Sequence, residues 1–253
     1  MLADHISYAS YLGAIRKMGY EMHDFGRVDG SYLKYIEIFN DPSLPWITLN
    51  GPAHPPEVSA VYGFLAFLAR DLPQGYNYLM VPTMNPYGFD QFTRTNGQGI
   101  DLNHSFNVSP VPLEITCYKG FVQEKMMGRK MARVLELHAD LPEDLEEGYE
   151  EEAPPDGLYI YQEGGDIRHG RVIMDTLGRR YRITTSELVY GYSCSGGVIH
   201  CNPFSGDGHD RFLETYLGQQ GWVVFTSEPP GTWVLEKGIK AQLDFLDACL
   251  RLQ

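Results

Sequence analysis

The stretch Trp-Ile-Thr-Leu-Asn-Gly-Pro-Ala-His-Pro-Pro-Glu, residues 46–57, indicates how this chain folds. Its first five residues form a short apolar run that ends at Gly51-Pro52, which is typical of a buried parallel strand. Beyond Pro55-Pro56, apolar residues recur at positions 61, 65, 68 and 72, the spacing of one helix face. The stretch therefore predicts a strand, a stiff turn and a helix that starts just after the prolines.

The same alternation continues along the chain. Apolar runs predict further strands at residues 78–82, 134–137 and 222–226, and an apolar stripe predicts a final helix from residue 235 to 250. Residues 158–161 and 180–184 also have the composition of strands. Strands that alternate with helices predict one α/β domain over residues 1–253, with a mixed, mostly parallel central sheet and helices on both faces.

Composition excludes several classes of protein. Hydrophobic residues make up 43% of the 253 residues, which is enough for a sizeable core, and no apolar run is long enough to span a membrane. The net charge of −13 disfavours binding to nucleic acid. Residues 1–20 lack a basic start followed by an apolar block, and the four cysteines form no CxxC pair. We therefore expect no signal peptide, a cytoplasmic location and no membrane partner.

Two strand ends carry residues that bind metals. His54 and Glu57 are three residues apart in a strand-to-helix turn, where both side chains can point at one cation, although an ordinary surface turn can have the same sequence. His138 directly follows the strand at 134–137. A histidine that stands alone in such a position is more commonly a hydrogen-bonded core residue. A His, Glu, His set would leave a fourth zinc position open, which is the arrangement of a catalytic site.

Two further residues have the chemistry of catalysis. Glu228 follows the last predicted strand, and a carboxylate beside a zinc-bound water can act as general base, although an acid before two prolines is also an ordinary loop residue. Residues 85–106 are rich in turn formers and carry one arginine, Arg94. That guanidinium can hold an oxyanion or a carboxylate, or lie in a plain surface loop.

In their order along the chain, these motifs resemble those of the zinc metallocarboxypeptidases of the carboxypeptidase A type. The matching motifs are Gly51-x-x-His54-x-x-Glu57, Asn85-Pro86-Tyr87-Gly88-Phe89, Arg94-x-Asn96, Gly99-Ile100-Asp101-Leu102-Asn103-His104-Ser105-Phe106, His138 after an apolar strand, and Glu228 shortly before the final helix. The chain also resembles the succinylglutamate desuccinylase and aspartoacylase branch. That branch shares the fold and the zinc site but cleaves acyl amides of amino acids.

The resemblance implies one zinc ion per chain, held by His54, Glu57 and His138. It implies that Glu228 is the general base that activates water. It also implies that Arg94 polarises the scissile carbonyl and stabilises the oxyanion.

The same resemblance implies that Asn103 and His104 contact the substrate. The family has an arginine where this chain has His104, and a neutral imidazole is a poor substitute for its bidentate contact with a terminal carboxylate. The family's mobile tyrosine has only candidates here, Tyr190 and Tyr192, which could also be packing residues.

Three functions follow from these observations. The first is a zinc-dependent amide or peptide hydrolase. The second is a deacylase of small N-acyl amino acids, for which Arg168 and Arg171 could bind a dianion unless they lie in an exposed loop. The third is a zinc-binding module without turnover, which the presence of both Glu228 and Arg94 disfavours.

Two other clusters have less specific patterns. His200-Cys201 with His209-Asp210 has the composition of a metal site but no recognised zinc spacing. The acidic run at residues 143–152 is typical of a solvated loop. Because the run begins soon after His138, it could also repel anionic substrates, a hypothesis that lysine-bearing and glutamate-bearing analogues would test.

Overall fold

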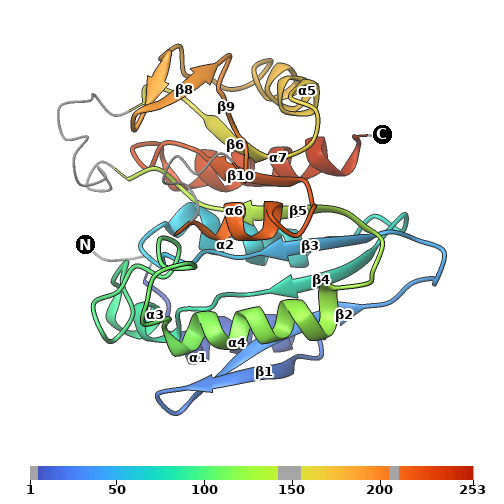
Figure 1. Cartoon of the computed structure of the whole chain (residues 1–253), viewed down its shortest axis with the longest axis vertical. Helices are drawn as coiled ribbons and strands as arrows, with labels where there is room; N and C mark the ends of the chain where they lie inside the picture. The colour runs from blue at the N-terminus through green and yellow to red at the C-terminus, as the bar shows by residue number, and fades with distance from the viewer. Residues whose placement is uncertain (1–4, 142–154, 205–210, 253) are drawn as a thin grey trace.

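The computed structural model describes residues 5–141, 155–204 and 211–252. Their ten strands form one sheet (Figure 1). The strand order is β1-β2-β4-β3-β5-β10-β6-β9-β8-β7. The strands are β1 (His23–Val28), β2 (Ser31–Ile38), β3 (Trp46–Asn50), β4 (Asn77–Val81), β5 (Met131–Leu137), β6 (Tyr159–Glu163), β7 (Leu188–Val189), β8 (Tyr192–Ser195), β9 (Val198–Cys201) and β10 (Val224–Glu228). The helices are α1 (Tyr8–Lys17), α2 (Val58–Leu68), α3 (Pro86–Gln91), α4 (Leu113–Phe121), the π-helix η1 (Val122–Met126), α5 (Arg168–Leu177), α6 (Leu213–Gly218) and α7 (Leu235–Leu250).

The four strands that the sequence predicts most clearly form the centre of the sheet. β4, β3, β5 and β10 lie side by side and pair in parallel. The prediction of a mixed α/β sheet is confirmed, but parallel pairing is less general than expected. Among the described strands, five of the nine neighbouring pairs are antiparallel. Three of these five pairs are hairpins of consecutive strands near the edges, which need only a tight turn, whereas β2–β4 and β6–β10 pair segments that are not consecutive in the chain.

Helices cover both faces of the sheet, as expected. Successive residues of a strand point to opposite faces, so each central strand supplies two cores. Leu135 and Phe225 join the core under α1, α2, α5 and α7, whereas Val134 and Val224 join the core under α4 and α6. This double burial accounts for the nearly continuous apolar character of the central strands.

The two helices predicted from apolar stripes both form, and they pack against each other. α2 begins at Val58, just after the two prolines, and α7 ends at Leu250. They approach closely at two glycines: a Cβ atom at Gly63 would come within 2.7 Å of the Cβ atom of Gln242, and one at Gly238 within 2.7 Å of the Cβ atom of Ser59. Among the described residues, no helix is both long enough and apolar enough to cross a membrane.

The prediction of a strand at residues 180–184 is wrong. These residues follow α5 as turns and bends, and only Ile183 makes an isolated bridge, with Leu158. Tyr181 and Ile183 alternate with polar residues because their side chains pack against the protein. The ring of Tyr181 stacks on Trp233, and its hydroxyl donates a hydrogen bond to Asp244 of α7. The strand predicted at 158–161 forms as β6. The acidic run at 143–152 lies outside the described residues.

Candidate metal centre and active-site pocket

The sheet brings three of the predicted ligands together. His54 and Glu57 lie in the turn between β3 and α2, and His138 directly follows β5. Because β3 and β5 are parallel neighbours, their carboxyl ends meet at the same edge of the sheet. One donor atom from each of the three residues lies within 4.8 Å of the other two, and all three residues are buried.

Glu57 sits between the two histidines. Its Oε1 is 2.6 Å from Nδ1 of His54, and its Oε2 is 3.1 Å from Nδ1 of His138. The backbone N–H of Ala139 also donates to Oε2, at 3.1 Å. Two imidazole nitrogens and a carboxylate therefore face one another, which is a donor set that zinc accepts.

A carboxylate behind the site orients His54. Oδ1 of Asp101 is 2.9 Å from Nε2 of His54, and the Nε–H of Arg94 donates to Oδ2 of Asp101 at 2.7 Å. Carboxylates that bind the second nitrogen of a metal-ligating histidine fix its tautomer and raise its basicity. Asp101 lies in the block of residues 99–106 that resembles the family motif, but nothing in the sequence pattern predicts its contact with His54.

Charge couples these groups strongly in the metal-free protein. Burial and the Arg94 cation oppose a proton on His54, but Asp101 and Glu57 outweigh them and raise its pKa to about 9. Burial likewise opposes the charge of Glu57, yet His138 and His54 lower its pKa to about 2. Burial lowers the pKa of His104 to about 3, so this residue is a neutral imidazole.

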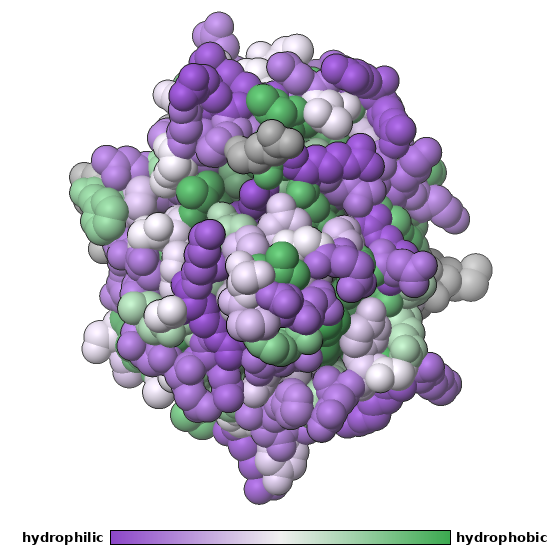
Figure 2. Space-filling model, turned by 90° about the vertical axis from the view of Figure 1, so that its right-hand side faces the viewer, coloured by the Kyte–Doolittle hydropathy of each residue, from purple (hydrophilic) through white to green (hydrophobic). Residues whose placement is uncertain are grey.

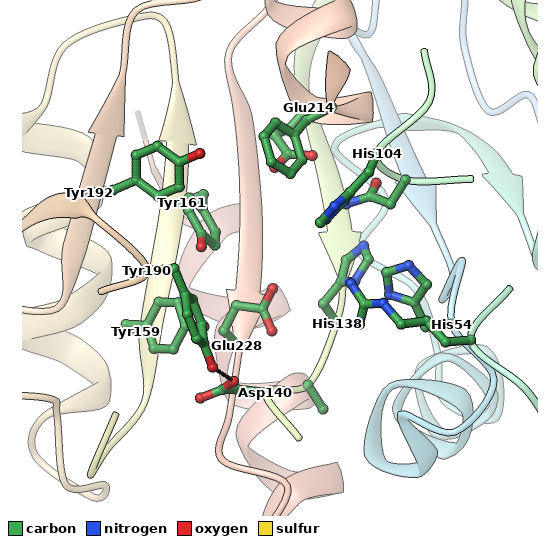
Figure 3. Close-up of a pocket in the computed structure, with 14 residues that line it drawn as sticks. His54, His104, His138, Asp140, Tyr159, Tyr161, Tyr190, Tyr192, Glu214 and Glu228 are labelled. Atoms are coloured by element: carbon green, nitrogen blue, oxygen red, sulfur yellow. Dashed lines mark hydrogen bonds between the residues drawn. The ribbon is translucent and has the colours of Figure 1, made fainter. Parts of the chain in front are cut away.

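A pocket opens beside the two histidines (Figure 3). It contains the other predicted site residues, Glu228, Arg94, Asn103 and His104. Glu228 is the last residue of β10, which pairs in parallel with β5, so its carboxylate emerges at the same sheet edge as His138. The complete lining is His54, Arg94, Asn103, His104, His138, Ala139, Asp140, Tyr159, Tyr161, Tyr190, Tyr192, Phe212, Glu214 and Glu228.

Tyrosines line the wall of the pocket across from the histidines. Tyr159 and Tyr161 come from β6. Tyr190 lies in the turn between β7 and β8, and Tyr192 is the first residue of β8 (Figure 3). The hydroxyl of Tyr190 donates to the carboxylate of Asp140, and its backbone has a φ of +50°. The sequence analysis considered only Tyr190 and Tyr192. The other two could not be found without knowing that β6 pairs with β10.

A glutamine of the last helix forms hydrogen bonds with the ends of the two strands that carry His138 and Glu228. Gln242, in the middle of α7, donates from Nε2 to the carbonyl oxygen of His138 at 2.5 Å. Its Oε1 accepts a hydrogen bond from the hydroxyl of Ser227, the residue before Glu228. Gln242 is fully buried. One side chain therefore links the strand ends that carry His138 and Glu228.

Other residues singled out in the sequence lie elsewhere. Arg168 is at the start of α5, where its side chain is 81% exposed and pairs with Asp166, and Arg171 is also exposed. Neither lines the pocket. His200 is exposed on β9, and its suggested partners, His209 and Asp210, lie outside the described residues.

Solved structures of metallohydrolases have the same fold. A candidate metallopeptidase from Shewanella denitrificans OS217 aligns with a TM-score of 0.75 and 20% identity, covering 96% of this chain and 87% of that protein. A metallo-carboxypeptidase from Pseudomonas aeruginosa, in complex with (2-guanidinoethylmercapto)succinic acid, aligns with a TM-score of 0.65 and 19% identity over 96% and 68%. A succinylglutamate desuccinylase from Silicibacter sp. TM1040 aligns at 0.57 and 13% over 91% and 64%.

The chain therefore has the fold of the candidate metallopeptidase, of the metallo-carboxypeptidase and of the desuccinylase, which is the fold that the sequence motifs implied. At such identities, the likeness concerns the fold. A family described as "Protein of unknown function (DUF2817)" matches residues 60–140, which include His138 but neither His54 nor Glu57. No curated protein matches the chain in sequence.

Proposed function

We propose that this chain is a zinc-dependent hydrolase of amide bonds that acts on peptides or N-acyl amino acids. The observation that carries the proposal is the convergence of His54, Glu57 and His138 beside a pocket that also contains Glu228 and Arg94. A bound zinc ion would supply the Lewis acidity that makes water a nucleophile near neutral pH. The donor set fits this ion, and Asp101 supplies the outer carboxylate that such histidines require.

The residues around the pocket have separate tasks in the proposed reaction. His54, Glu57 and His138 hold the metal. Glu228 takes a proton from the attacking water and delivers it to the leaving nitrogen. Arg94 donates hydrogen bonds to the carbonyl oxygen as negative charge develops there, and Asp101 holds that guanidinium in place.

Deacylation of small dianionic N-acyl amino acids receives less support. Such a substrate needs cations to neutralise its carboxylates, and Arg94 is the single arginine or lysine that lines the pocket within the described chain. Arg168 and Arg171, the candidates for that task, are exposed on α5. A module without turnover is also disfavoured, because Glu228 and Arg94 both line the pocket that the two histidines border.

Metal analysis combined with a substrate panel tests the proposal. The panel contains peptides with free and blocked C-termini, γ-glutamyl-diaminopimelate peptides and N-acyl amino acids. We expect about one zinc ion per chain, and hydrolysis that Glu228→Gln abolishes while the zinc content is kept. The matched control is Glu21→Gln, an exposed residue before β1. A wild-type protein that binds no zinc, or that hydrolyses its substrate equally well as Glu228→Gln, would refute the mechanism.

A further inference from the structure

The part of the pocket away from the metal ligands is acidic and aromatic. Figure 3 shows Tyr161 and Tyr192 on one wall, with Glu214 at one end of the pocket and Asp140 near the other. Aromatic faces carry negative charge density, and carboxylates carry a full charge. These groups together create a negative potential where a substrate side chain would lie.

Glu214 is a buried acidic residue whose side chain can interact with a substrate in the pocket. It lies in the first turn of α6, is 5% exposed, and lines the pocket. Coulomb interactions at such buried positions are several times stronger than in bulk water. A cation that enters the pocket is therefore attracted by Glu214, and an anion is repelled.

Asn103 provides an independent sign of what the pocket accepts. It is 6% exposed and lines the pocket, and its side-chain oxygen Oδ1 is buried without a hydrogen-bond partner among the described residues. A buried acceptor left without a donor destabilises the protein. A ligand with an N–H group would satisfy this oxygen.

Arg94, the one arginine that lines the pocket within the described part of the chain, points toward Asp101 and Glu57. Nε of Arg94 donates to Asp101 at 2.7 Å, and its NH1 is 3.8 Å from Oε1 of Glu57. Its charge thus lies beside the carboxylates of the metal centre. The Glu214 end of the pocket has no lysine or arginine among its described lining residues.

We propose, on the basis of the function proposed above, that the pocket selects substrates with a cationic side chain, a primary ammonium or a guanidinium. Glu214 is the specificity-determining residue. Tyr161 and Tyr192 present ring faces and hydroxyls to the cation, an interaction that stabilises ammonium and guanidinium groups. Asn103 accepts a hydrogen bond from an N–H group of the same substrate.

Matched substrates that differ in one side chain test this proposal. Benzoylglycyl derivatives of lysine, norleucine and glutamate are compared, each with a free and with an amidated C-terminus. In the wild type, we expect kcat/KM for lysine to exceed that for norleucine about tenfold, with glutamate the poorest substrate. The readout is the lysine-to-norleucine ratio within each variant, so a general loss of activity cancels.

Variants locate the selectivity at one carboxylate. Glu214→Gln should bring the ratio close to one, Glu214→Asp should keep most of it, and the control Glu21→Gln should leave it unchanged. If Glu214→Gln does not fold by circular dichroism, Tyr192→Leu replaces it and should also lower the ratio. A wild-type ratio near one, or a ratio that folded Glu214→Gln leaves intact, would overturn the proposal.

The same compounds separate this inference from the proposed function. Hydrolysis of lysine and norleucine substrates at equal rates would support the hydrolase and refute the cation site. If no compound is hydrolysed, calorimetric binding to the zinc-loaded wild type is measured instead. Tighter binding of the lysine compound, lost in Glu214→Gln, would support the cation site without the hydrolase. Equal binding, or no binding, would refute the cation site.

Discussion

At the scale of single residues, the metal centre depends on a contact outside the three ligands. Asp101 joins His54 to Arg94, so one carboxylate orients both a proposed metal ligand and the proposed oxyanion donor. The backbone N–H groups of Asn103 and His104 also donate to Oδ1 of Asp101, at 3.0 and 3.4 Å. The turn that holds Asn103 in the pocket is therefore built on the same side chain.

Asp101→Asn should weaken zinc binding by about 10- to 100-fold, the usual effect of losing an outer carboxylate. The amide keeps an oxygen that can face His54, but it loses the charge that raises the basicity of the ring. Competition with a chromophoric chelator measures the affinity. Asp71→Asn, in an exposed loop, is the control and should bind zinc like the wild type. An unchanged zinc affinity in Asp101→Asn would show that this contact does not tune the metal.

Some of the site's residues could be found from the sequence and others could not. His54, Glu57 and His138 follow apolar strands, so their shared sheet edge is predictable from the strand pattern. Glu214 and Tyr161 have no such signal. Glu214 belongs to a short helix of six residues, and Tyr161 belongs to a strand whose antiparallel place beside β10 depends on pairing between segments distant in the chain.

At the scale of elements, α7 does more than cover the sheet. Its Gln242 joins the ends of β5 and β10 through His138 and Ser227, and Gly63 of α2 leaves the space that the glutamine needs. The sequence pattern of this helix does not predict the two hydrogen bonds that Gln242 makes. Only the register of α7 against the sheet reveals its two hydrogen bonds.

Gln242→Leu should lower the free energy of unfolding by about 2–4 kcal/mol. The substitution keeps the side-chain volume similar but leaves the buried carbonyl of His138 without this donor. It also leaves the hydroxyl of Ser227 with only the more distant carbonyl oxygen of Glu136, at 3.5 Å. The loss of such a partner costs about 1–3 kcal/mol for each group. Urea unfolding of the metal-free protein measures the change. Gln74→Leu, at an exposed position, is the control and should be nearly neutral. A loss below about 1 kcal/mol would mean that water or local rearrangement satisfies both groups.

The strand pattern predicts the centre of the sheet better than its β6–β9 side. β3, β4, β5 and β10 are buried on both faces, so each appears as an apolar run in the sequence. β7, β8 and β9 have only two to four residues each, and glycines with positive φ separate β7 from β8 and β8 from β9. Runs this short carry little periodicity, whereas the longer alternation at 180–184 reflects contact with α7.

At the scale of the whole molecule, the site lies where the two cores meet at the carboxyl edge of the sheet. Strand ends from both halves of the sheet contribute, and no single hairpin or helix contains the metal ligands. The three ligands gather only when β3, β5 and the turn before α2 are in place. Binding of a metal to them should therefore stabilise the folded chain as a whole.

The pH dependence of unfolding should differ in sign between the metal-free and the zinc-loaded protein. In the metal-free protein, the pKa of His54 is raised from 6.5 to about 9 because Asp101 and Glu57 outweigh the opposing effects of burial and Arg94. A raised pKa contributes stability that is fully present below pH 6.5 and disappears as the pH rises through 9, about 3 kcal/mol in total. Zinc instead requires the deprotonated ring, so its stabilisation grows with pH over the same range.

Urea unfolding at pH 6.5, 7.5 and 8.5, after chelator treatment and after addition of zinc, measures both slopes. We expect the free energy of unfolding to fall with pH for the chelated protein and to rise or stay level for the zinc-loaded protein. The control is His54→Gln, which removes the titrating ring and should flatten the falling slope. If the chelated wild type and His54→Gln had the same slope, the proton on His54 would not be coupled to folding, and the carboxylate pair around it would not hold the charge inferred here.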